Sequence, residues 1–283
     1  LYDYDSPVRR QEDRYPMMSW AQNYRHPVNG VCWTAFFAGQ AFTPDWKIEG
    51  RNVQDYLQDH YFGAVRALAE RLAPLDNVVG FDSLNEPGSG WSGQKLSYRH
   101  LAPTPEDPRP PMPGLAWSPL DALAAAAGFS ASLPIVAFDP TTLSLALAGE
   151  RTVNPDGRRL WLDDGPDPFE RAGIWTAEGG RPRALREDAF SRIGNRPVDH
   201  DRDFMGPFLA QAARNVREVR EDWLLFAEID PFAVATGHPL PPLPGASVNA
   251  SHWYDLRTLS QKSFDPDCDA EATRRLYTEQ LSQ

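Results

Sequence analysis

Cysteine is scarce in this chain. Cys32 and Cys268 are the only two among 283 residues, and they lie far apart without the short spacing that metal ligands show. We therefore expect two free thiols rather than a disulfide, and neither a metal ion nor a cofactor.

Clusters of basic residues and long apolar runs are also missing. The formal net charge is −11, and no run of Lys or Arg offsets it, which argues against nucleic acid as a partner because such binders present a basic face. No apolar run reaches the ~18 residues of a transmembrane helix. The Ala-rich stretch Leu120–Ala127 is shorter and predicts a buried helix.

The chain begins at Leu1, in an acidic and aromatic segment without the features of a secretory leader. We expect the native N-terminus to lie outside this sequence. The compartment is therefore left open, with the cytoplasm slightly favoured.

A repeating order of helix and strand is what the sequence does contain. Residues 51–72 predict a helix, because apolar residues recur at helical spacing between charges. The predicted apolar face consists of Leu57, Tyr61, Ala64, Val65, Leu68 and Leu72. The run 78–81 is apolar at consecutive positions, which predicts a strand covered on both faces.

The same order occurs again towards the C-terminus. A helix over 204–222, with Phe208, Ala212, Val216 and Val219 on its apolar face, leads into an apolar strand over 223–227. A third strand is predicted over 247–251 and a last helix over 270–281. Helices alternating with buried strands are typical of a parallel α/β sheet or barrel.

Residues 88–203 interrupt this order with an insertion of about 115 residues, far longer than ordinary loops. Its stretch 102–114 is rich in proline and is expected to be extended. An insertion of this size usually covers or shapes a site; the alternative is a subdomain remote from any chemistry.

Polar residues follow each of the three predicted strands. Asn85 and Glu86 end the first strand, Glu228 ends the second, and His252 with Tyr254 follows the third. Catalytic groups of α/β barrels lie at the carboxyl ends of their strands. Two such carboxylates suggest a glycosidase, in which one acts as the acid and the other as the nucleophile. The alternative for Glu86 is a strand-end salt bridge.

Aromatic residues accompany these strand ends. Trp91, Trp253 and Tyr254 can stack on sugar rings or can fill core space, and the sequence leaves both possibilities open.

Three segments in this order carry a resemblance to a known family: NVVGFDSLNEPGSGW (77–91), WLLFAEIDPF (223–232) and SVNASHWYDLRTLSQKSF (247–264). They are similar to glycoside hydrolase family 5, closest to its branch of β-glucosylceramidases and steryl β-glucosidases, relatives of the endoglycoceramidases. Further similar stretches are NYRHPVNGVCWTAFFAGQAFTP, GIWTAEGGRPRALREDAF and HDRDFMGPFLAQAARNV. The resemblance thus extends along most of the chain.

This resemblance implies a (β/α)8 barrel that hydrolyses a glycoside or glycolipid with retention. It assigns the general acid/base to Glu86, at the end of barrel strand 4, with Asn85 contacting the sugar. His252 and Tyr254, after strand 6, would line the substrate site. We add Trp253 and Trp91 to the predicted substrate-binding residues because of their aromatic rings. Glu228, after strand 5, would lie behind that site or at its rim.

The nucleophile of the family is a Glu that ends strand 7. After Tyr254 this chain has only Glu271 and Glu279, and both fall in the predicted last helix. Without the insertion about 168 residues remain, whereas a barrel of ~250 residues uses about 30 for each strand and helix. We therefore expect residues 1–283 to be a partial barrel domain, an internal fragment with strands 4–6 and inactive alone.

Two alternatives stay open. Glu228 could itself be the nucleophile of a self-contained glycosidase, in which case its loss would abolish activity. Alternatively the chain could be a carbohydrate- or lipid-binding protein of the same family that has lost its catalytic activity.

Overall fold

A computed structural model describes residues 27–105, 111, 114–139, 144–162, 165–229, 241–252 and 267–281. The chain divides into two compact units, each described here by itself. The first unit contains residues 1–59 and 89–200, and the second contains residues 60–88 and 201–283. The assignment of 1–283 as one partial barrel domain with an insertion over 88–203 stays a prediction.

A three-stranded parallel sheet forms the centre of the second unit. Strand β11 (Leu224–Ala227) lies between β3 (Gly80–Asp82) and β12 (Ser247–Asn249). The register places Phe226 opposite Asp82 on one side and opposite Val248 on the other. Because both pairings are parallel, the carboxyl ends of all three strands lie at one edge of the sheet.

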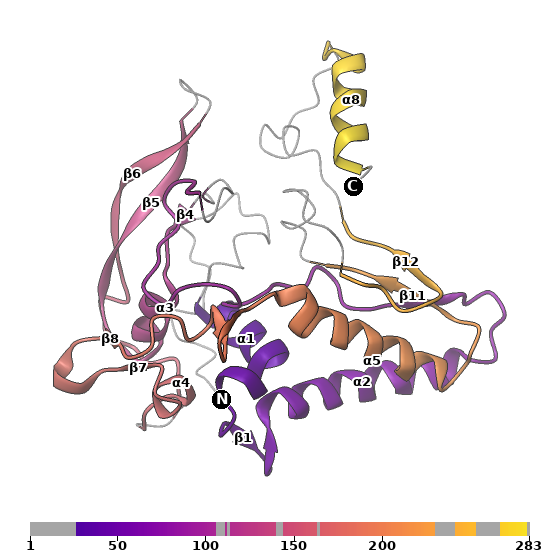
Figure 1. The fold of residues 1–283 in the computed structure, drawn as a ribbon, viewed down its shortest axis with the longest axis horizontal. Coiled ribbons are helices and arrows are strands. Elements are labelled where there is room, and N and C mark those ends of the chain that lie inside the picture. The colour runs from indigo at the N-terminus through magenta and orange to yellow at the C-terminus, as the bar shows by residue number, and fades with distance from the viewer. Residues whose placement is uncertain are drawn as a thin grey trace. The chain divides into compact units, whose positions relative to one another are not determined.

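Helices α2 (Val53–Leu72) and α5 (Gly206–Arg217) lie side by side along this sheet (Figure 1). A π-helical turn, η3 (Asp201–Met205), precedes α5, and helix α8 (Ala270–Leu281) comes last. Ala69 of α2, Val216 of α5 and Trp223 form a buried cluster against which Phe81 packs. The predicted helices and strands are therefore confirmed, with β3 beginning at Gly80 rather than at residue 78.

The predicted apolar face of α2 is wrong in part. Leu68 is 51% exposed, whereas Phe62 and Ala69 are buried, so the helix turns a neighbouring stripe towards the core. Strand β3 is also less covered than predicted, since Val79 just before it is 59% exposed. The apolar face predicted for α5 is confirmed by the burial of Phe208, Ala212 and Val216, with Val219 partly buried on the cluster.

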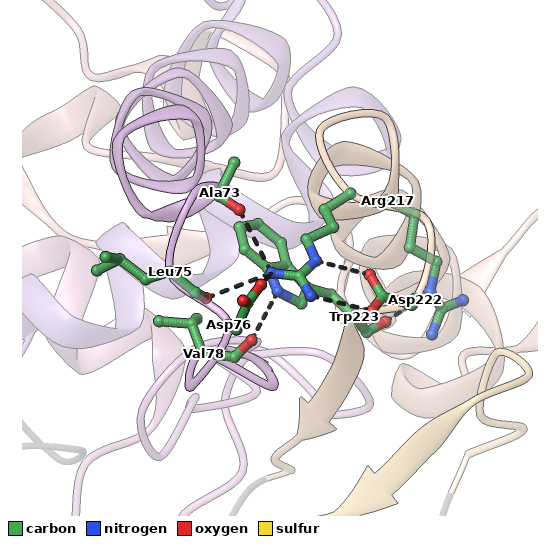
Figure 2. Close-up of polar contacts among 8 residues, drawn as sticks. Ala73, Leu75, Asp76, Val78, Arg217, Asp222 and Trp223 are labelled. Carbon is green, nitrogen blue, oxygen red and sulfur yellow. Dashed lines mark hydrogen bonds and ion pairs between the residues drawn. The ribbon is translucent and has the colours of Figure 1, made fainter.

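The turns at the other edge of the sheet are joined by an arginine (Figure 2). Arg220, in the turn between α5 and β11, donates from Nη1 to the carbonyl oxygens of Ala73 and Leu75, each at 3.3 Å. Its guanidinium also binds the Asp222 carboxylate and lies over the Trp223 ring. The Trp223 indole N–H in turn donates to the Val78 carbonyl oxygen at 2.9 Å. These bonds connect the turn before β3 to the turn before β11.

The first unit consists mostly of short elements (Figure 1). Aromatic rings of these elements pack against one another in its core. Its helices are α1 (Pro27–Phe42), α3 (Pro119–Ala126), α4 (Pro168–Arg171) and the 3₁₀ turn η2 (Glu178–Gly180). A three-stranded sheet has the order β4 (Gly114–Leu115), β5 (Ala131–Asp139), β6 (Ser144–Val153). Three two-stranded pairs are β1 (Lys47–Ile48) with β2 (Arg51–Asn52), β7 (Trp175–Thr176) with β8 (Arg183–Ala184), and β9 (Arg192–Ile193) with β10 (Arg196–Pro197).

Helix α3 is the buried helix predicted from the Ala-rich stretch. Ser118 caps its first turn, because its hydroxyl accepts from the Asp121 amide while the Asp121 carboxylate accepts from the Ser118 amide. Arg99 then binds both oxygens of Asp121 at 2.7 Å, which holds the pKa of that carboxyl group below its usual value despite burial.

Two further predictions concern membrane-spanning helices and the proline-rich stretch. No helix among the described residues is long and apolar enough to cross a membrane. Of the proline-rich stretch 102–114, residues 106–110 and 112–113 lie outside the described residues.

Candidate active site

The candidate site lies at the carboxyl edge of the parallel sheet, entirely within the second unit. Glu86 comes four residues after β3, Glu228 directly follows β11, and His252 comes three residues after β12. The parallel register brings these strand ends to one edge, and their side chains meet there.

Ser83 joins the ends of the first two strands. Its backbone amide donates to the Phe226 carbonyl oxygen at 2.8 Å, which continues the pairing one residue beyond β3. Its hydroxyl oxygen accepts the backbone amide of Glu228 at 3.0 Å, and its carbonyl oxygen accepts the Tyr61 hydroxyl. Ser83 is buried, so the three bonds fix the start of the loop that carries Glu86.

Glu86 adopts a left-handed backbone conformation, with φ of 45°. A non-glycine residue in this region costs on the order of 1 kcal/mol or more and is found most often at functional sites. The compensating contact is direct: the Glu86 amide donates to the Oε2 atom of Glu228 at 2.8 Å. A hydrogen bond contributes about 0.5–1.5 kcal/mol, and more to a charged acceptor, which is of the same order as the strain.

His252 bridges the two glutamates. Its Nδ1 atom lies 2.6 Å from Glu86 Oε1, and its Nε2 atom lies 3.2 Å from Glu228 Oε1. Both carboxylates are buried, at 7% and 2% exposure, whereas the imidazole is 37% exposed. The hydrogen bond with Glu86 is the main cause of a raised pKa of His252, and the negative charges of Glu228, Glu86 and Asp82 act in the same direction.

Glu228 holds its proton more tightly than an ordinary glutamate. Burial raises the pKa of Glu228 to about 7, and a hydrogen bond with the Asp82 side chain acts in the same direction. The negative charge of Asp82 also raises this pKa, because it disfavours a second negative charge on Glu228. The amide of Glu86 and the charge of His252 act in the opposite direction, because both stabilise the carboxylate form of Glu228.

Three residues of this network were not predicted from the sequence: Tyr61, Asp82 and Ser83. Tyr61 looked like an apolar position of a helix face, but its hydroxyl reaches the strand end, and burial raises its pKa to about 12. Asp82 and Ser83 stand in the segment that carries the resemblance. The signal that could have identified Ser83 is a hydroxyl residue directly after an apolar strand and three residues before Glu86.

The structure brings together Glu86, Glu228 and His252, three of the predicted site residues. Asn85 lies beside Glu86 and is exposed. Trp253 and Tyr254 lie outside the described residues. Within the described ranges, no group of three His, Cys, Asp or Glu side chains is arranged to hold a metal ion.

Trp91 is a core residue of the first unit. It is 6% exposed and packs against the rings of Phe169 and Phe190. Its amide donates to the Thr34 hydroxyl at 3.0 Å, and the preceding Gly90 approaches Thr34 so closely that no side chain would fit. These contacts favour the core-filling alternative for Trp91 over contact with a sugar.

Curated relatives of this chain are fungal glycoside hydrolases. The chain is 26% identical over 268 residues to a glucosylceramidase of Cryptococcus neoformans var. grubii, a match that covers 87% of this chain and 34% of that protein. It is also 26% identical over 298 residues to the ergosteryl-beta-glucosidase of Saccharomyces cerevisiae, covering 91% of this chain and 36% of that protein. The chain therefore spans about a third of the length of the curated relatives it matches. No protein-family model matches the chain.

Solved structures similar to this chain are also glycosidases of fungal origin. A crystal structure of Cryptococcus neoformans sterylglucosidase 1 with a compound named hit 1 matches with a TM-score of 0.76 and 26% identity. The match covers 88% of this chain and 37% of that one. The same enzyme with tris matches with a TM-score of 0.74 and 28% identity. The predicted resemblance to the glucosylceramidase and sterylglucosidase branch is confirmed, and the fold is consistent with a barrel glycosidase, although the described residues form only partial sheets and no closed barrel.

Proposed function

We propose that this chain carries the acid/base half of the active site of a retaining β-glycosidase that acts on a glycolipid, of the glucosylceramide or steryl glucoside type. The observation that carries the proposal is the network of Glu86, Glu228 and His252 at the carboxyl edge of a parallel sheet. Its support from outside the chain is the similarity to a glucosylceramidase and an ergosteryl-beta-glucosidase over about nine tenths of this chain.

On this proposal the sheet is part of a (β/α)8 barrel, with β3, β11 and β12 as its strands 4, 5 and 6. The order β3–β11–β12 follows the chain, as consecutive strands of a barrel do. The edge that carries Glu86 and His252 is the one on which barrel enzymes place their catalytic groups.

Glu86 acts as the general acid/base in this mechanism. Its carboxyl group donates a proton to the departing glycosidic oxygen, so that the sugar leaves the lipid as the nucleophile attacks the anomeric carbon. The resulting Glu86 carboxylate then accepts a proton from water, which releases the sugar from the enzyme with net retention. Asn85 and Tyr254 contact the sugar, as the resemblance implies, and Trp253 stacks on it through its aromatic ring.

Glu228 does not supply the nucleophile. It is 2% exposed, and its two oxygens are directed at the Glu86 amide and at His252. A nucleophilic carboxylate must instead reach the anomeric carbon of a bound sugar. Glu271 lies in the first turn of helix α8 rather than at the end of a strand. We therefore propose that the nucleophile is a carboxylate outside these 283 residues.

Glu86→Gln in the protein as its gene encodes it tests this proposal. Hydrolysis of a steryl β-glucoside or glucosylceramide should fall about 10³-fold, because general acid/base catalysis supplies about 10²–10⁴-fold. Azide should restore turnover of an activated aryl β-glucoside and give a β-glucosyl azide, because azide attacks the glycosyl-enzyme without a general base. Glu221→Gln, at an exposed position of the same unit, is the control and should keep full activity.

Two outcomes would contradict the proposal. Unimpaired hydrolysis by Glu86→Gln would show that Glu86 is not the acid/base. Binding of the lipid glucoside without any hydrolysis by the unaltered protein would instead favour the carbohydrate- or lipid-binding alternative.

A further inference from the structure

We propose that Glu228 is a positioning residue, whose carboxyl group fixes both the backbone of Glu86 and the ring of His252 and thereby decides where the proton between them resides. This inference rests on the proposed function and deepens it. It gives a buried carboxyl group at the site a role that is neither that of the acid/base nor that of the nucleophile.

The first contact of Glu228 sets the direction of the Glu86 side chain. Oε2 accepts the Glu86 amide at 2.8 Å while the φ angle of Glu86 is 45°. With the amide held on Glu228, rotation of φ to the ordinary negative range would swing the Cα–Cβ bond about the N–Cα bond and turn the Glu86 side chain to another direction. The hydrogen bond therefore holds the conformation that aims the Glu86 carboxyl group at His252.

The second contact sets the tautomer of His252. Nε2 lies 3.2 Å from Glu228 Oε1, an ion-pair distance, and whenever Glu228 is ionised this contact favours a proton on Nε2. Nδ1 is left to face Glu86 Oε1 at 2.6 Å. The proton in that contact lies either on Glu86 or on Nδ1. Glu86 is in its acid form in the first case and in its base form in the second. Glu228 thus keeps the ring in an orientation that serves both forms of Glu86.

Several elements supply the charged and titratable groups near His252. The negative charge of Asp82, at the end of β3, raises the pKa of both Glu228 and His252, and Tyr61 of α2 contacts the strand end through Ser83. Glu86 and His252 complete the set. Three carboxyl groups therefore surround one imidazole. If Glu228 lost its charge, His252 would lose one of the carboxylates that stabilise its cation.

The test is Glu228→Gln in the protein as its gene encodes it. The amide keeps the size of the side chain, but its single oxygen can accept from only one of the two donors, the Glu86 amide or the His252 ring. We expect kcat for a steryl β-glucoside to fall about 100-fold, the effect of a misplaced catalytic group, while KM changes little. We also expect the NMR titration midpoint of the His252 ring nitrogens to move to lower pH.

Glu221→Gln is the matched control and should change neither the rate nor the His252 titration, because Glu221 is exposed. Glu228→Asp is the second variant, for use if the Gln variant does not fold. Its shorter side chain keeps the charge but cannot reach both donors, so kcat should fall while the His252 titration stays near that of the unaltered protein.

Three results would overturn the inference. The first is a folded Glu228→Gln protein with an unchanged His252 titration, and the second is an unchanged kcat. The third is rescue of Glu228→Gln by azide with inversion to an α-glucosyl azide, which would make Glu228 the nucleophile. If the unaltered protein hydrolyses no glycoside, the proposed function fails, yet the His252 titration still decides whether Glu228 controls the ring.

Discussion

At the scale of single residues, the site depends on hydrogen bonds that cross between strand ends. Ser83 uses its amide, hydroxyl and carbonyl to bond Phe226, Glu228 and Tyr61. None of these partners is near Ser83 in sequence. The polar character of Glu86, Glu228 and His252 was readable from the sequence, but their pairing was not, because it depends on the register of β3, β11 and β12.

The protonation of Glu228 predicts a pH dependence of stability. Its pKa is raised to about 7, so between the ordinary pKa of 4.5 and about 7 the folded state binds a proton that the unfolded state releases. Stability is then highest at low pH and is lost as the pH rises through this window. The raised pKa of His252 acts in the same direction.

Glu228→Gln should therefore cost stability at pH 5 and cost less, or even increase stability, at pH 8. The measurement is the melting temperature of both proteins at the two pH values, with Glu221→Gln as a control of constant offset. A difference between Glu228→Gln and the unaltered protein that is the same at both pH values would contradict the assigned proton.

At the scale of elements, helix α2 shows what periodicity leaves undecided. Two overlapping apolar stripes run along residues 53–72, one through Leu68 and one through Phe62 and Ala69. The sequence pattern fits both, and the packing of α5 and Trp223 selects the second. Helix α5 has one strong stripe, so its buried face was predicted correctly.

Strand β3 is paired so closely with β11 that its first residue must be glycine. A Cβ atom at Gly80 would lie 2.1 Å from the Leu224 carbonyl oxygen, a backbone atom that cannot move away alone. We expect Gly80→Ala to destabilise the protein by about 1–3 kcal/mol, the usual cost of overpacking, and to weaken the site by displacing the loop of Glu86.

Gly63→Ala in α2 is the matched control. It is the same substitution in the same unit, at an exposed helical position with nothing within 4 Å of the added Cβ atom. It should stabilise the protein by about 1 kcal/mol, because alanine is the better helix former. The measurement is the urea midpoint of each variant. A lower midpoint for Gly80→Ala and a higher one for Gly63→Ala would support the close pairing of β3 with β11, whereas equal shifts of the same sign would contradict it.

At the scale of the whole molecule, the two units differ in what they contribute. In the second unit, Glu86, Glu228 and His252 contact one another at the edge of the parallel sheet. The first unit is built around an aromatic core that includes Trp91, Phe169 and Phe190. The division after Gly88 separates Glu86 from Trp91, five residues apart in one continuous motif. The burial of Trp91 favours its core-filling role, while its contact with a sugar stays a prediction.

We predict that these 283 residues do not contain the nucleophile. The 283-residue chain by itself should not hydrolyse an aryl β-glucoside, whereas the protein as its gene encodes it should. If the chain alone turned over the substrate, the nucleophile would lie within it, and azide rescue of Glu228→Gln would show whether Glu228 is that residue.

The sequence by itself determined the order of helices and strands, the acid/base candidate and the resemblance to glycolipid glycosidases. Periodicity and strand-end motifs are local, so they could be read from neighbouring residues. Only the tertiary structure decided which stripe of α2 is buried, that Trp91 is buried in the first unit, and that Glu228 contacts both the Glu86 amide and His252. Those features depend on contacts between residues far apart in the chain, and a contact of that kind leaves no periodic mark in the sequence.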